Sequence, residues 1–316
     1  MLYKNTFKIF FSNGSLIWHT LLYLLISASI VFGAGALILS PLYHTLSEVG
    51  WTTAISDSYM NFLNQINLKQ LLIDIGDNGR WFVQIIIDNM GKLLPYIILF
   101  VIVIIVVGSI VVRFYTMSAS TCVNYYMNSN VKASFPNNIF TSFYRNFRYQ
   151  LAYTVTVLPI NIAIYSLIIY MLKLFESEGF LFIITPFILV LTFTILASLK
   201  MTLFGGWLPA IVSSNKGVFA CMKKGFVVAK RRFGETFGNA FALYLTIIFV
   251  NFFGGVLTFG VGLIVTIPAS CILVCVFQNV SYYMAIGQKY YVDNFNVIAP
   301  KAQEYTDKFG NHKYII

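Results

Sequence analysis

The residues with the clearest capacity for binding chemistry are five cations that fall within ten positions in the last third of the chain. Lysine and arginine at this density bind anionic groups, such as lipid phosphates at the cytoplasmic face of a membrane or the carboxylates of a protein partner. The cluster therefore predicts a contact site for anionic lipid or for a partner. Its members are Lys223, Lys224, Lys230, Arg231 and Arg232.

The spacing around these cations favours a helix within 207–235. At 100° per residue, apolar side chains from Val218 onward share one arc, and Lys216, Lys223, Lys224, Lys230 and Arg231 lie opposite. The apolar arc contains Val218, Phe219, Met222, Phe226, Ala229 and Phe233. We therefore predict a cytoplasmic basic amphipathic helix that lies in a membrane interface or against other helices.

A second set of polar side chains lies inside long apolar runs. It consists of the amides Asn161, Asn251, Gln278 and Asn279. Hydrogen bonds between neighbouring helices are the ordinary role of such groups in a membrane. The alternative is that they line a path for a polar solute. No acidic or basic residue is expected inside a membrane segment, which argues against a proton-coupled pump.

Catalytic and metal-binding patterns are missing from the sequence. The three histidines and four cysteines form no HExxH motif and no Cys-His spacing typical of zinc. Cys271 and Cys275 are one helical turn apart, but no histidine or carboxylate lies near them, which favours apolar packing. We predict no cofactor, no metal site and no enzymatic activity.

Composition sets the class of protein that must position these residues. Of 316 residues, 58% are hydrophobic and 10% are charged, with a mean hydropathy of +0.77. An average soluble domain has about 25% charged residues. The sequence therefore predicts an all-α, polytopic bundle of transmembrane helices forming one membrane domain over 1–316.

Six apolar segments are long enough to cross a bilayer. A signal peptide is the rival interpretation of the first, but its apolar run exceeds the usual length of such a core. The 53 uncharged residues between Glu235 and Lys289 must turn back, and Gly254, Gly255, Gly260 and Gly262 favour a hairpin there. The predicted spans are 16–39, 93–112, 149–172, 179–199, 236–256 and 262–286.

The distribution of basic residues predicts the topology. Only Lys69, Arg80, Lys92 and Lys173 of the 21 lysines and arginines fall on one side; the other 17, Arg113 and Lys200 included, are assigned to the opposite side. The positive-inside rule then places both termini in the cytoplasm, with the protein in the cell (plasma) membrane. It assigns 116–148 to a cytoplasmic loop and 41–92 to extracytoplasmic interfacial helices.

The same distribution explains the net charge of +10 without nucleic acid, because the cations are spread over every inner loop and no recognition fold accompanies them. A weak repeat is also present: short aromatic and basic segments at 6–15, 139–148 and 218–232 each precede an outward-going span. This order suggests three units, each with one interfacial helix and two spans.

One stretch carries a family resemblance. The run 206–212, then Gly217-Val218-Phe219 and the basic segment to Phe233-Gly234, resembles bacterial polytopic membrane proteins of poorly characterised function. These include the membrane domain that precedes the catalytic domain of some glycerophosphodiester phosphodiesterases. The resemblance covers about 35 residues and the six-span plan. The hydrolytic chemistry of that family belongs to a separate soluble barrel and is not implied for this chain.

Two hypotheses follow for function. The first is a non-catalytic scaffold or accessory subunit that binds anionic lipid, a protein partner or a second copy of itself through its cytoplasmic basic helices. The alternative is a transporter or permease-like subunit for a small or amphipathic solute. The alternative requires a polar cavity that reaches Asn161, Asn251 or Asn279, and a solid apolar interior would remove it.

Overall fold

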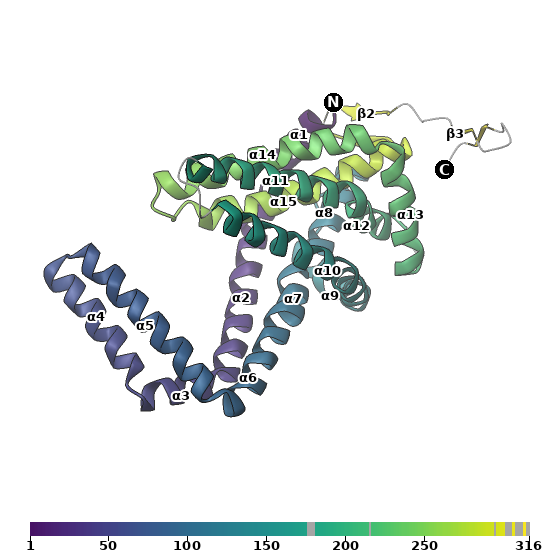
Figure 1. Cartoon of the computed structure of the whole chain (residues 1–316). Coiled ribbons are helices and arrows are strands. Elements are labelled where there is room, and N and C mark those ends of the chain that lie inside the picture. Colours follow the sequence, from purple (N-terminus) through teal and green to yellow (C-terminus); the bar gives the residue numbers. More distant parts are fainter. Residues whose placement is uncertain (176–180, 215, 294, 301–304, 307–311, 314–316) are drawn as a thin grey trace. The chain divides into compact units, whose positions relative to one another are not determined.

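A computed structural model describes residues 1–175, 181–214, 216–293, 295–300, 305–306 and 312–313 (Figure 1). The contacts divide the chain into two compact units, so the single domain predicted over 1–316 is subdivided. Unit 1 comprises Met1–Leu25 and Arg113–Ile316, and unit 2 comprises Ile26–Val112. Predicted span positions 179–180 and the basic tail residues Lys301 and Lys308 lie outside the described residues.

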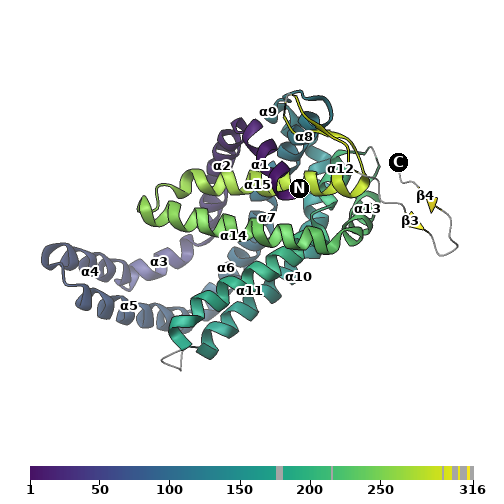
Figure 2. The same cartoon turned by 90° about the horizontal axis from the view of Figure 1, so that it is seen from above.

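Unit 1 contains most of the helices. Pairs that run side by side include α10 with α11 and α14 with α15 (Figures 1 and 2). The helices are α1 (Leu2–Ser12), the first part of α2 (Ser15–Ile38), α8 (Tyr115–Ser129), α9 (Phe135–Thr141), α10 (Phe143–Phe175), α11 (Leu181–Phe204), α12 (Trp207–Val212), α13 (Val218–Arg231), α14 (Phe233–Leu257) and α15 (Leu263–Ile286). Two short strand pairs follow, β1 (Tyr290–Tyr291) with β2 (Val297–Ile298) and β3 (Tyr305–Thr306) with β4 (His312–Lys313).

The elements of unit 2 are all helices, joined by short turns. The unit holds the rest of α2, then α3 (Ser40–Glu48), α4 (Trp51–Gln65), α5 (Leu68–Asp88), α6 (Met90–Ile102), the π-helix η1 (Val103–Gly108) and most of α7 (Ser109–Arg113). Helices α4 and α5 form a hairpin (Figure 2). In it, the Trp51 indole donates a hydrogen bond of 2.9 Å to the carbonyl oxygen of Asn78, and the Asn78 amide donates to the Ser58 hydroxyl at 3.1 Å.

Six helical segments among the described residues are long and apolar enough to cross a membrane, which confirms the predicted class of multi-pass, all-α membrane protein. Several of these segments extend beyond the uncharged runs of the sequence. The six segments are Ser15–Ile38, Met90–Ser129, Phe143–Lys173, Ile184–Val212, Phe233–Leu257 and Leu263–Ile286.

At two of the predicted span boundaries, the helices continue through charged residues. The loop expected from 116 is occupied by α8, which runs to Ser129, and only one non-helical residue, Phe114, separates it from α7. Lys200, expected just outside a span, lies within α11. A charge ends an apolar run in the sequence, but it does not end a helix whose backbone remains hydrogen bonded.

The prediction of a single helix over 207–235 is wrong. The structure divides this stretch into α12, α13 and the start of α14. The Arg145 guanidinium donates hydrogen bonds to the carbonyl oxygens of Ser214 and Lys216, the latter at 3.0 Å. These bonds satisfy carbonyls that a continuous helix would have paired internally, so Arg145 supports the break before α13.

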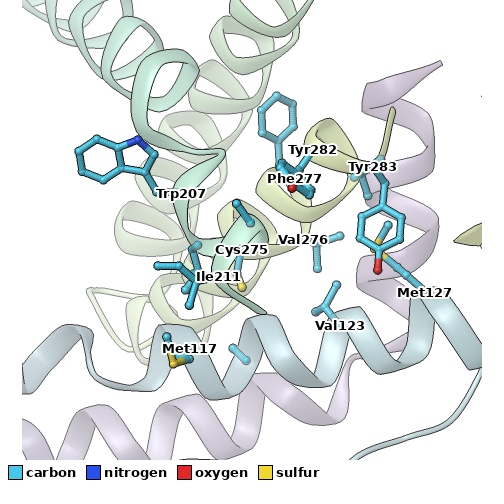
Figure 3. Packing of buried hydrophobic residues seen from close by; sticks show 14 of the residues in the cluster. Met117, Val123, Met127, Trp207, Ile211, Cys275, Val276, Phe277, Tyr282 and Tyr283 are labelled. Carbon is cyan, nitrogen blue, oxygen red and sulfur yellow. The ribbon is translucent and has the colours of Figure 1, made fainter. Parts of the chain in front are cut away.

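The buried core of unit 1 lies where α8, α12 and α15 meet (Figure 3). Met117 and Val123 of α8, Ile211 of α12 and Phe277 of α15 are almost completely buried there. Close backbone packing brings α13 to the same region: a Cβ atom built on Gly225 would lie 2.5 Å from the carbonyl oxygen of Gly206. Only glycine allows this approach.

The hairpin predicted between the last two spans is present. Helix α14 ends at Leu257 and α15 begins at Leu263, with Gly260 at φ +91° in the turn. A Cβ atom on Gly262 would lie 2.5 Å from the carbonyl oxygen of Gly254, so the two helices meet at a backbone contact. The glycines therefore serve both the reversal and the packing.

Candidate functional site

A cavity of about 330 Å³ lies inside unit 1 and is partly open. Its walls come from the end of α7, from α8, α10, α11, α12, α14 and α15, so segments far apart in the chain converge on it. The lining residues are Arg113, Tyr115, Thr116, Tyr149, Tyr153, Lys200, Met201, Phe204, Gly205, Leu208, Tyr244, Ile247, Ser270, Cys271, Val274, Cys275 and Gln278.

Arg113 reaches this cavity from the junction of α7 and α8. Two buried amides of α10 hold the junction: Gln150 donates to the carbonyl oxygen of Arg113 at 3.0 Å, and Asn146 donates to that of Phe114 at 2.6 Å. The guanidinium carbon lies 3.8 Å from the centroid of the Tyr153 ring. This cation–π contact stabilises the charge without neutralising it.

Lys200 reaches the cavity from α11, the helix that packs against α10. Its Nζ donates a hydrogen bond of 2.9 Å to the Oδ1 atom of Asn161 on α10. An ammonium carries three donors, so one hydrogen bond to a neutral amide leaves two of them for other acceptors. Lys200 and Arg113 are both only half-buried, because the cavity exposes part of each side chain.

The remaining walls combine a few polar groups with a larger apolar surface. Ser270 accepts a hydrogen bond of 2.9 Å from the Asn251 amide, while Phe204, Leu208 and Val274 contribute hydrocarbon. Ligand sites in proteins typically have this composition, with apolar walls and a small number of convergent polar groups. The cavity is therefore suited to binding a small or amphipathic molecule.

The four predicted amides have different places in this arrangement. Gln278 lines the cavity directly, and Asn161 and Asn251 contact it through Lys200 and Ser270. Asn279 is fully buried elsewhere, where it bonds the Ser120 hydroxyl at 3.0 Å and joins α15 to α8. Three of the four amides therefore belong to the cavity or to its immediate support.

The basic residues of α13 lie on the surface of unit 1. Lys223 and Lys224, with Lys216 and Arg231, border a separate groove of about 340 Å³. The Lys230 ammonium lies 4.7 Å from the Phe226 ring centroid. Arg232 has partners, since it donates to the carbonyl oxygen of Met284 at 3.3 Å and pairs with Glu235 at 3.2 Å.

The packed face of α13 differs from the predicted apolar arc. Val218 and Met222 are buried as expected, but Cys221 and Val228 are buried with them, while Phe219 is 77% exposed. The Gly225 side of α13 faces the rest of unit 1, because its backbone comes closest to the Gly206 backbone at this glycine.

The functional residues that the sequence did not indicate are Arg113 and Lys200. Both end an uncharged run, so both were counted as topological signals. The only available signal was their position within about one helical turn of a span, which does not distinguish a cavity cation from a loop cation. The tyrosines of the cavity gave no signal either, because 20 tyrosines are spread along the chain.

Ser270, Cys271 and Lys200 are among the side chains of the cavity whose types can act as nucleophiles. The cavity has no histidine and no carboxylate, and no cluster of metal-binding side chains occurs in the part of the chain that the structure describes. What the cavity offers is two positive charges, hydroxyl and amide groups, and hydrocarbon. Comparisons with family models, curated proteins and solved structures find no match to this chain.

Proposed function

We propose that this chain is a non-enzymatic membrane protein that binds a small or amphipathic solute in the cavity of unit 1, as a ligand-binding or permease-like subunit. The observation that carries the proposal is the cavity itself, which reaches Asn161 through Lys200 and Asn251 through Ser270. A solid apolar interior would have left only the scaffold hypothesis.

Two general properties of membrane proteins support this choice. Charged side chains within membrane helices are costly, and they usually face a water-filled cavity or a substrate path. The cavity also falls within the range of about 300–1,000 Å³ that is usual for small-molecule sites. A polar molecule in the cavity would give Arg113 and Lys200 a role beyond that of topological signals.

The test uses Cys271, a half-buried thiol of the cavity wall. In a chain whose other three cysteines are replaced by alanine, we expect a small water-soluble methanethiosulfonate to modify Cys271 in membranes. Val274→Trp should fill the cavity and slow modification about tenfold or more. Ile267→Trp, at an exposed position of the same helix, is the matched control. Equal rates in the two tryptophan variants would contradict the proposal.

A second candidate function rests on α13. Its surface lysines and the groove they border support binding of anionic lipid or an acidic partner. Each cation near an anionic bilayer contributes about 1 kcal/mol. The triple variant Lys223→Gln, Lys224→Gln and Lys230→Gln should therefore lose most co-purified anionic lipid, and unchanged lipid content would argue against this role. Arg232 is left intact because its partners are structural.

The second candidate requires α13 on the cytoplasmic side of the plasma membrane, where the positive-inside rule also predicts both termini. A cysteine introduced by Lys224→Cys into a chain without other cysteines should react with a membrane-impermeant reagent only after the cells are opened. Labelling of intact cells would reverse the topology. The cavity proposal would survive that result, whereas a contact with cytoplasmic partners would not.

A further inference from the structure

The cavity of unit 1 has a charge character that narrows the class of its ligand. Building on the proposed binding function, we infer that the occupant carries an anionic group, a phosphate or a carboxylate, held between Arg113 and Lys200, and an apolar part that contacts the hydrocarbon walls. The inference rests on the charges, donors and wall residues of the cavity.

Neither cation has a counter-charge among the residues that the structure describes. The ion pairs Lys8–Asp293, Arg80–Asp77 and Arg232–Glu235 involve no residue of the cavity. The described residues of the cavity wall include no aspartate or glutamate. The neighbours of the two cations are neutral: the Tyr153 ring beside Arg113 and the Asn161 oxygen beside Lys200.

Two positive charges in one partly enclosed space are unfavourable in the empty protein. Removal from water costs free energy that neutral partners recover only in part, and like charges repel each other more strongly at low dielectric. A single anion between them relieves both effects. The guanidinium of Arg113 offers a planar fork that matches two oxygens of a phosphate or carboxylate, and Lys200 keeps two donors unused.

The rest of the cavity wall favours an amphiphile over a bare ion. Apolar side chains from four helices face the same space, among them Phe204 of α11, Leu208 of α12, Ile247 of α14 and Val274 of α15. A bare ion would leave this surface in contact with water. A hydrocarbon segment covers it and removes apolar area from water, which favours binding.

A membrane lipid with an anionic headgroup and a soluble organic anion share this chemistry. The experiment separates them with three probes added to the purified full-length chain in neutral detergent, with binding read by native mass spectrometry. The probes are lysophosphatidic acid, lysophosphatidylcholine with the same acyl chain, and inorganic phosphate. We expect lysophosphatidic acid to bind at least tenfold more tightly than the zwitterionic lysolipid. Competition by inorganic phosphate at similar concentration would identify a soluble anion as the source.

The variants assign the anion to the two cations. Arg113→Gln and Lys200→Gln should each weaken binding of lysophosphatidic acid about tenfold and leave lysophosphatidylcholine unaffected. Arg113→Lys keeps the charge and should bind lysophosphatidic acid within a few fold of the unmodified chain. That result would show that position 113 tolerates substitution. Lys132→Gln removes an exposed charge between α8 and α9 and should change binding less than twofold.

The possible failures are distinguishable. If both lysolipids bind equally and Val274→Trp abolishes both, the cavity is a ligand site but the inference of an anion is overturned. If lysophosphatidic acid binds as tightly to Arg113→Gln and Lys200→Gln as to the unmodified chain, the inference is overturned again. If no probe binds and Cys271 is inaccessible to thiol reagents, both the proposed function and the inference of an anionic ligand are overturned.

Discussion

Two groups of cations in this protein differ in surroundings more than in chemistry. Arg113 and Lys200 lie in a cavity among the helices of unit 1, next to neutral partners. Lys223 and Lys224 lie on α13 beside an outer groove. The surface pair is solvated at little cost, whereas the half-buried cavity pair has lost part of its hydration, which costs free energy. Charges that persist at such a cost point to function more strongly than a dense surface cluster does.

The two groups of cations also differ in the contacts that hold them in position. The cavity cations are positioned by side chains of α10, namely Gln150 at the Arg113 carbonyl and Asn161 at the Lys200 ammonium. The position of α13 depends instead on a backbone contact, between Gly225 and Gly206. Side-chain positioning suits a binding site, since rigid helices hold the first contacts and hydrogen bonds orient them.

The strongest test exchanges a charge for hydrocarbon. In protein freed of anionic lipid, Lys200→Met should leave the free energy of unfolding unchanged or raise it by about 1 kcal/mol, because it replaces a half-buried charge by an apolar side chain of similar volume. Lys223→Met on the surface should stay within about 0.5 kcal/mol. Thermal unfolding in detergent measures the stability of both variants. A marked loss of stability in Lys200→Met would contradict the difference drawn between the cavity cations and the surface cations.

The backbone contact that positions α13 is tested by Gly225→Ala. The added methyl group meets the carbonyl oxygen of Gly206, so we expect a loss of about 1–3 kcal/mol, the usual cost of overpacking. Gly234→Ala in α14 is the control, because no atom lies within 4 Å of its added Cβ. Thermal unfolding of both should separate them clearly. Equal melting temperatures would show that α13 can shift without cost.

Two neighbouring amides of α15 provide a smaller contrast. Asn279→Ala removes a buried partner of Ser120 and should cost about 1–2 kcal/mol, since loss of a buried hydrogen bond leaves an unsatisfied group. Gln278→Ala faces the cavity and should change ligand binding more than stability. Unfolding and probe binding are measured on the same preparations. A large loss of stability in Gln278→Ala would mean that this side chain is structural.

The smallest effect concerns an exposed turn near the end of unit 1. Hydrogen bonds from the Asn296 side chain and from the Phe295 backbone N–H lower the pKa of Asp293 below its ordinary value. A carboxyl with a lowered folded-state pKa stabilises the turn above its unfolded pKa, and that contribution is lost as the pH falls through the folded value. Chemical shifts of the β1–β2 turn should therefore change only below about pH 4. Asp293→Asn should remove the transition.

Some features follow from local sequence rules. Apolar runs longer than a bilayer thickness must form helices whose backbone groups are paired internally, so six long helices were predictable. The glycines between Gly254 and Gly262 likewise indicated the α14–α15 hairpin, because the uncharged stretch is too long for one crossing. The amides Asn161, Asn251 and Gln278 were recognised as polar groups inside apolar runs, although not their shared location.

Other features depend on contacts between distant segments. The break between α12 and α13 is supported by Arg145, nearly 70 residues earlier in the chain, and no local pattern encodes that pairing. The buried face of α13 is set by the Gly206 backbone. Phe219 therefore remains exposed although the helical period alone would have buried it.

The class of the protein follows from its sequence alone, because hydrocarbon thickness and backbone hydrogen bonding leave a long apolar run almost no alternative to a helix. That Arg113 and Lys200 share one cavity is a consequence of the packing of the helices. Their positions in the chain are 87 residues apart, and their meeting depends on how α10 packs against α11 and on which carbonyls its amides contact. Helix formation is a local property, whereas a binding site is a property of packing.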